Sequence, residues 1–172
     1  NESVSREAWS DRHLGDVADI GLMSQQNDLV AAMLETGKPV VALLVNGRPL
    51  AMPLVADRVP AVIESWYAGQ EGDTAIAEVL FGDVNPGGKL PVTFPRHAGQ
   101  LPVYYNRRPT SFRDYLDVTR EPLWAFGFGL SYTTFRLDEL RVAAPAIGPG
   151  GRTAVTVRVT NSGTREGDEV VQ

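Results

Sequence analysis

The sequence contains no cysteine and only two histidines, His13 and His97, among its 172 residues. The absence of cysteine excludes disulfide bonds and thiolate metal ligands. Two histidines alone are too few for a structural zinc site, which takes four Cys or His ligands. The composition therefore gives no support for a metal centre.

Positive charge and long apolar runs are also scarce. The chain has 16 Lys and Arg against 21 Asp and Glu, which gives a net charge of −5 and a pI of about 5.0. Nucleic-acid-binding domains usually carry a basic surface, so we expect no nucleic-acid partner. No apolar run approaches the roughly 18 residues that a membrane span needs, and the first residues lack the pattern of a signal peptide. With 43% hydrophobic residues, however, the chain can bury a core.

The first periodic segment, SQQNDLVAAMLETG, predicts a helix. Its apolar residues recur at helical spacing between Leu29 and Leu34, with Ser24 at the N-cap position and Gly37 just past the end. The run PVVALLV, residues 39–45, is apolar at every position. Such a run is typical of a parallel strand that is buried on both faces.

A second strand and helix follow. An apolar, strand-like stretch extends from about Ala61 to Trp66, after a helix-like turn, and GQEGD then opens a helix that ends before Gly82. Glu71 and Asp73 lie at the start of this helix, where carboxylates cap free amides and complement the helix dipole. The alternation of helices and strands predicts an α/β sandwich with a mainly parallel sheet flanked by helices.

The remainder of the chain changes character twice. Residues 96–128 show no clear period and predict a long ordered loop. Apolar and polar residues alternate over 153–160, and a turn follows at 161–163. The final EVVQ predicts the start of one more strand. We expect the first strands of an all-β domain here, and a fragment that is open at both ends.

Phosphate-binding motifs are incomplete. The Gly127–Gly129 pair lacks the third glycine of a dinucleotide motif, and Lys89 in PGGKL lacks both the Walker spacing and the following Ser or Thr. No nucleophile elbow G-x-S-x-G is present. Carboxylates remain, and glycoside hydrolysis needs a pair of them, one protonated and one ionised. From the residues alone, Glu2 and Glu7 in NESVSREAW are candidates, although an exposed loop glutamate is far more often solvated than catalytic.

Three long blocks resemble the C-terminal part of glycoside hydrolase family 3. They are GKPVVALLVNGRPL, ESWYAGQEGDTAIAEVLFGDVNPGGKLPVTFP and PLWAFGFGLSYTTF, in this order. The trailing VTVRVTNSGTREGDEVVQ resembles the start of the fibronectin type III-like domain that follows in many members. The resemblance implies an α/β sandwich domain over residues 1–134 and the start of the fibronectin-like domain over 135–172.

This resemblance also implies an activity and its residues. The family's enzymes are retaining, exo-acting β-glycosidases, with a nucleophile on a preceding barrel domain that is absent here. The second glutamate of the acid/base loop matches Glu7, with Glu2 as the alternative. Trp9, like Tyr104, Tyr105 and Trp124, is a candidate wall of a sugar site or else part of the core or a domain interface.

The resemblance implies no metal and no organic cofactor, a β-linked oligosaccharide or glycoside as substrate, and the barrel as partner within the same chain. It favours β-glucosidase over β-xylosidase, and a periplasmic or secreted location over a cytoplasmic one. The oligomeric state is left open. Two alternatives to an enzyme are left open. The protein is either a non-catalytic homologue that binds or scaffolds carbohydrate, or a structural interaction domain of unrelated function.

Overall fold

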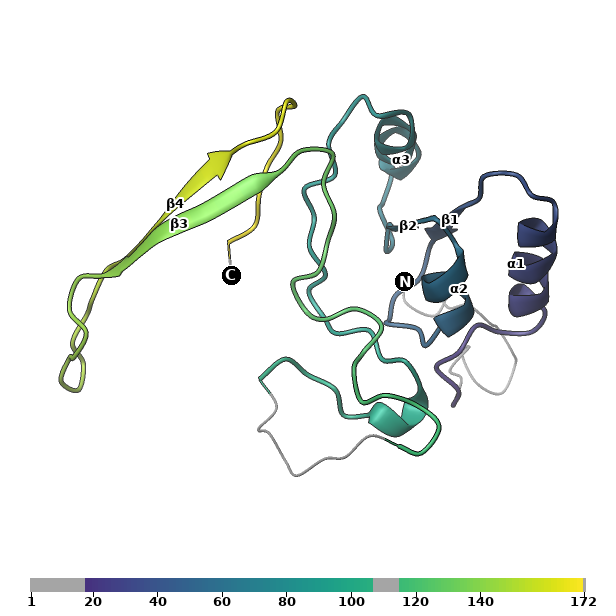
Figure 1. Ribbon diagram of the computed structural model, residues 1–172, viewed down its shortest axis with the longest axis horizontal. Coiled ribbons are helices and arrows are strands. Elements are labelled where there is room, and N and C mark those ends of the chain that lie inside the picture. Colours follow the sequence, from purple (N-terminus) through teal and green to yellow (C-terminus); the bar gives the residue numbers. More distant parts are fainter. Residues whose placement is uncertain (1–17, 107–114, 172) are drawn as a thin grey trace. The chain divides into compact units, whose positions relative to one another are not determined.

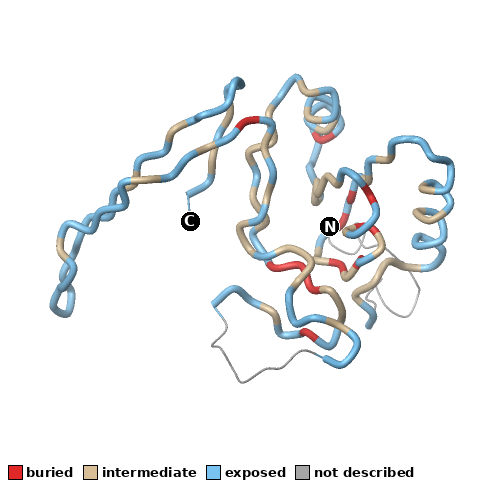
Figure 2. The backbone as a smooth tube through the Cα atoms, viewed as in Figure 1, coloured by how far each residue is buried: buried red, intermediate tan, exposed pale blue. Residues whose placement is uncertain are grey.

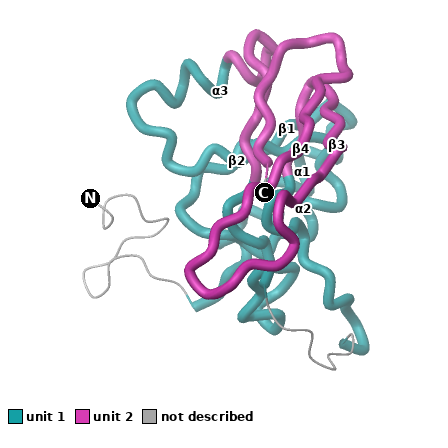
Figure 3. Tube along the Cα trace, turned by 90° about the vertical axis from the view of Figure 1, so that its left-hand side faces the viewer, with its two compact units in different colours: residues 1–77, 90–128 teal, residues 78–89, 129–172 magenta. Residues whose placement is uncertain are grey.

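The computed structural model describes residues 18–106 and 115–171. The chain divides into two compact units, coloured separately in Figure 3. The first comprises residues 1–77 and 90–128, and the second comprises residues 78–89 and 129–172. Within the described ranges, no helix is both long enough and apolar enough to cross a membrane.

The first unit has the predicted α/β order. Its elements are α1 (Gln26–Glu35), β1 (Val41–Leu44), α2 (Pro53–Arg58), β2 (Ala61–Glu64) and the start of α3 (Gly72–Phe81), as Figure 1 shows. Strands β1 and β2 are parallel, with Val41 opposite Ala61 and Leu44 opposite Glu64. The predicted parallel sheet with helices is thus confirmed. Helix α2 begins with Pro53. Proline is tolerated at the first helical position, because an N–H there would make no hydrogen bond within the helix.

Helix α1 ends as predicted but begins one residue later. Gly37 has a φ of +67°, and its N–H donates to the carbonyl of Leu34, as expected of a glycine that terminates a helix. The N-cap is Gln25, which makes no side-chain capping bond, so the assignment of Ser24 was wrong. Ser24 instead has a φ of +49°. The left-handed backbone there is not the extended conformation of a capping serine.

Burial of β1 on both faces was also a wrong prediction for the described part of the chain. Leu44 is buried, whereas Val41 and Leu43, which point to the other side, are 47% and 42% exposed. The reason is that the buried core lies on one face only. Its members are Leu44, Leu50, Met52, Val55, Val59 and Phe94, and Figure 2 shows the buried positions in red.

Helix α3 confirms the predicted ends. The Asp73 carboxylate accepts the N–H of Thr74 at 2.8 Å, which satisfies one of the free amides of the first turn. Glu71 contributes its backbone carbonyl, which accepts from Ala75. Gly82 follows the last helical residue with a φ of +82°. This conformation is readily available to glycine and ends the helix.

The long loop over residues 96–128 is irregular in its described parts, as predicted, and one buried side chain orders it. Gln100, in the short 3₁₀ helix η1 (Ala98–Gln100), accepts the N–H of Arg96 at 2.6 Å. Its amide nitrogen donates to the carbonyls of Thr119 and Glu121 at 3.2 and 3.0 Å. A single glutamine therefore connects both described ends of the loop.

The second unit contains an antiparallel hairpin of β3 (Phe135–Val142) and β4 (Val155–Asn161). The strand and the turn that were predicted from the alternation are confirmed by β4 and the residues after it; the Gly163 N–H donates to the Asn161 side chain at 3.0 Å. Strand β3 was not anticipated. One extra residue between Asp138 and Arg141 forms a bulge, which breaks the period of two on which a strand prediction depends.

The predicted strand at EVVQ is absent from the described residues, where 169–171 are irregular. A strand exists only through its pairing, and these residues have no ladder partner among the described segments. Residues 169–171 therefore have the composition of a strand but are not paired with any described strand.

Candidate functional site

The residues assigned from sequence to catalysis lie outside the described part of the chain. Glu2, Glu7 and Trp9 fall within residues 1–17, so their roles remain predictions. Within the described residues, polar side chains converge at another position, which the sequence analysis did not predict.

That place is the carboxyl end of the parallel strands. Glu64 is the last residue of β2 and pairs in register with Leu44, the last residue of β1. Asn46 follows β1 by two residues and is only 3% exposed. Carboxyl ends of parallel strands lie at one edge of a sheet, and ligands of open α/β folds usually bind there. We call Asn46, Glu64, Ser65 and Trp66 the strand-end cluster.

Glu64 is the acid of the strand-end cluster. Its Oε1 accepts the backbone N–H of Trp66 at 3.0 Å, and Asn46 Nδ2 donates to Oε2 at 3.4 Å. Burial raises the pKa of this carboxyl above its usual value, although the two hydrogen bonds act in the opposite direction. The net effect is a carboxyl that holds its proton more tightly than an exposed glutamate does.

The backbone beside Glu64 is held in an unusual conformation. Trp66 has a φ of +51°, a left-handed value that costs a bulky side chain energy. Ser65 fixes this turn: its N–H donates to the Leu44 carbonyl at 3.0 Å, and its Oγ lies 2.8 and 3.1 Å from the carbonyls of Leu44 and Trp66. The strained residue is thus held by bonds on both sides.

Trp66 leads into a row of aromatic rings. Its ring lies 5.8 Å from that of Phe94, which is fully buried and lies 5.6 Å from Trp124. Trp124 also stacks on Phe128 at 6.5 Å. Of the roles open to Trp124, packing against the core is the one that these contacts support.

The two tyrosines that were candidates for a sugar site differ from Trp124. Tyr104 and Tyr105 are 55% and 71% exposed, and Tyr105 stacks on Phe126 with ring centres 4.6 Å apart. Neither ring belongs to the core. The structure thus separates one partly buried aromatic residue, packed against the core, from two exposed ones, which residue type alone did not distinguish.

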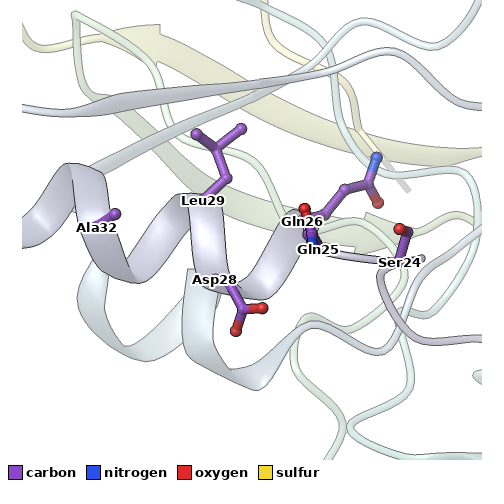
Figure 4. A pocket seen from close by; sticks show the side chains of 6 residues that line it. All are labelled: Ser24, Gln25, Gln26, Asp28, Leu29 and Ala32. Carbon is purple, nitrogen blue, oxygen red and sulfur yellow. The ribbon is translucent and has the colours of Figure 1, made fainter.

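An open pocket lies at the start of α1 (Figure 4). Six residues line it: Ser24, Gln25, Gln26, Asp28, Leu29 and Ala32. Asp28 is the one carboxylate among the described residues of this lining, which thus do not supply the pair that glycoside hydrolysis requires. The strand-end cluster likewise has a single carboxylate. Neither site forms a glycosidase centre from the residues that the structure describes.

Sequence reasoning missed Glu64 although a signal was present. Glu64 is the one acidic residue in the mainly apolar stretch 61–66, and Asn46 follows a continuous apolar run. Taken alone, Glu64 and Asn46 each indicate only the polar end of a strand. Only the parallel pairing of β1 with β2 places the two side chains together.

Comparison with known proteins identifies the family. The model of the glycosyl hydrolase family 3 C-terminal domain matches residues 1–132. The chain therefore belongs to glycosyl hydrolase family 3, and the matched part is its C-terminal domain.

Among sequence relatives, a β-xylosidase from Formosa agariphila is 48% identical over 162 residues, which are 92% of this chain and 22% of the relative. A periplasmic β-glucosidase from Salmonella typhimurium is 44% identical over 165 residues, covering 90% of this chain and 22% of that protein. The chain thus spans about a fifth of the length of these relatives.

Solved structures agree. A β-glucosidase from Erythrobacter marinus matches with a TM-score of 0.86 and 46% identity, covering 97% of this chain and 22% of that one. A β-glucosidase from Listeria innocua in complex with isofagomine has a TM-score of 0.67 and 37% identity, over 74% of this chain and 20% of its own. At these identities the likeness supports the family assignment as well as the fold.

Proposed function

We propose that this chain is the acid/base-bearing part of a retaining, exo-acting β-glycosidase that removes terminal non-reducing β-D-glycosyl residues. β-Glucosidase is the preferred activity and β-xylosidase the alternative. The observation that carries this proposal is the identity of 48% and 44% to a β-xylosidase and a β-glucosidase over about nine-tenths of the chain. The substrate is a β-linked oligosaccharide or glycoside.

In this proposal the catalytic pair is divided between two domains. Glu7 protonates the leaving oxygen and then deprotonates the incoming water, while a carboxylate on a barrel domain of the same protein attacks the sugar. Trp9, two residues further on, contributes an aromatic face to the sugar site. Glu7 can act as an acid only where the adjacent Arg6 does not hold it ionised, because a nearby cation lowers the pKa of a carboxyl.

The domain boundaries belong to the same proposal: residues 1–134 form the α/β domain and residues 135–172 begin a fibronectin type III-like domain. Support comes from the apolar residues that the hairpin leaves exposed. Leu137 and Val159 face each other across the strands and are 48% and 41% exposed. A second sheet packed on this hairpin would bury them, as in a β-sandwich.

The test uses the complete protein with Glu7→Gln, and Glu2→Gln as the matched control. Loss of general acid–base catalysis costs roughly 10²–10⁴-fold in rate. We expect the larger loss with poor leaving groups, a smaller one with p-nitrophenyl glycosides, and partial rescue by azide. Equal kinetics for Glu7→Gln and wild type would refute the assignment of Glu7, and a loss confined to Glu2→Gln would move the role there.

Activity itself is tested separately. The complete protein should hydrolyse p-nitrophenyl β-glucoside or β-xyloside, whereas the 172-residue chain should not exceed the buffer blank, because it carries only one carboxylate of the proposed pair. A complete protein that binds sugar without hydrolysis would instead support the non-catalytic homologue.

A further inference from the structure

Lys89 of the PGGKL motif forms a largely buried ion pair. Lys89 Nζ lies 3.2 Å from Glu169 Oε1, and the two side chains are only 12% and 14% exposed. The same ammonium donates to the Gly129 carbonyl at 2.9 Å. Gly129 fits closely there, since a Cβ would lie 2.5 Å from the Gly88 carbonyl. These contacts occupy Lys89 with protein acceptors.

A second contact joins the same segments of the chain. The guanidinium of Arg165 donates to the carbonyl of Gly82, and it also lies over the ring of Tyr132, 5.5 Å from the ring centre. The Tyr132 hydroxyl donates in turn to the Val79 carbonyl at 2.8 Å. Arg165 therefore satisfies a carbonyl at the end of α3, where helical carbonyls lack backbone partners.

Asn85 makes the third contact. Its Oδ1 accepts from the Ser131 hydroxyl at 3.0 Å and from the Tyr132 N–H at 2.7 Å. Gly167 passes so near that an added Cβ would lie 2.4 Å from Asn85 Nδ2. The loop after α3, residues 129–133 and residues 161–171 thus meet at three separate points within the second unit (magenta in Figure 3).

We propose that residues 161–171 act as a clasp that fixes the loop Gly82–Lys89 after helix α3, with the Lys89–Glu169 pair as its anchor. The clasp lies beyond residue 132, where the match to the family domain ends, and yet it holds a loop inside that domain. It follows that the segment after β4, although it lies in the proposed fibronectin-like domain, fixes the conformation of a loop of the family domain. This inference does not depend on the proposed catalytic activity.

The Lys89–Glu169 ion pair predicts how single and double variants of the clasp should differ, and how they should respond to salt. Removing one partner of a buried ion pair leaves the other charge uncompensated, whereas removing both partners relieves that cost. Buried pairs are also screened much less by salt than exposed ones. Lys89→Met and Glu169→Gln should therefore each loosen the loop, and the double variant should loosen it less than the sum of the two.

The experiment is hydrogen exchange by NMR on the 172-residue chain, with the Tyr132 N–H, which is bonded to Asn85, as reporter. We expect each single variant to accelerate exchange at Tyr132 at least tenfold, at both 0.1 and 1 M NaCl. Glu166→Gln is the matched control, because it makes the same chemical change at an exposed site three residues away and should leave the rate unchanged.

The Phe94 N–H, bonded to the Trp124 carbonyl in the first unit, separates local loosening from global unfolding. Its exchange should stay at the wild-type rate in every variant. The clasp is overturned if Glu169→Gln exchanges at Tyr132 like Glu166→Gln, if 1 M NaCl abolishes the difference, or if Phe94 and Tyr132 accelerate equally.

Discussion

Replacement of Phe94 by alanine should remove a large part of the stability of the first unit. The side chain is fully buried, and its ring contacts Trp66 on one side and Trp124 on the other. Deletion of a buried phenylalanine costs about 3–5 kcal/mol, and each aromatic pair adds roughly 0.5–1.5 kcal/mol beyond the area that it buries. Because two large rings border the cavity, we expect about 4–5 kcal/mol.

This loss is large against the whole stability of a domain, which is about 5–15 kcal/mol. The matched control is Phe128→Ala, since Phe128 also contacts Trp124 but is 43% exposed. It should cost about 1–2 kcal/mol, because less apolar area is returned to water. Urea unfolding followed by far-UV circular dichroism measures both values. A loss below about 2 kcal/mol for Phe94→Ala, or one no larger than that of Phe128→Ala, would refute this account of the core.

Three further predictions concern the strand-end cluster, the loop and the clasp. Burial raises the pKa of Glu64 in the folded chain, so the folded state binds this proton more tightly and the contribution of Glu64 to stability should fall as pH rises from about 4 to 7. Glu64→Gln removes this titration, so the variant should gain stability relative to the wild type between pH 4 and pH 7. An equal difference between the urea midpoints of variant and wild type at pH 4 and pH 7 would contradict this prediction. Gln100→Leu removes the side-chain partner of three part-buried backbone groups, the Arg96 N–H and the carbonyls of Thr119 and Glu121. It should destabilise the loop by about 1–3 kcal/mol and speed amide exchange at Arg96; unaltered exchange there would argue against the role of Gln100. Gly129→Ala should destabilise the chain by about 1–3 kcal/mol, whereas Gly88→Ala, with open space around its Cβ, should be close to neutral in thermal unfolding; equal melting temperatures would show that the packing tolerates both.

Local sequence patterns are sufficient to predict most helices and strands of the α/β part. Periodicity and glycine punctuation predicted α1, β1, β2 and α3, because helix ends and buried strands depend on neighbouring residues. Alternation likewise predicted β4 and its turn. Strand β3 was not predicted, because a bulge shifts the phase of its alternation. The N-cap of α1 was predicted wrongly, because Ser24 adopts a left-handed backbone conformation.

Tertiary structure decided what the polar and aromatic side chains do. Glu64 and Asn46 are 18 positions apart and meet only because β1 and β2 are parallel. Trp124 packs against the core while Tyr105 stays exposed, although both are aromatic residues of one loop. Lys89 meets Glu169 across 80 positions, from 89 to 169, and no local pattern encodes such a contact. A residue's type sets which interactions it can make, and long-range packing selects the one that it does make.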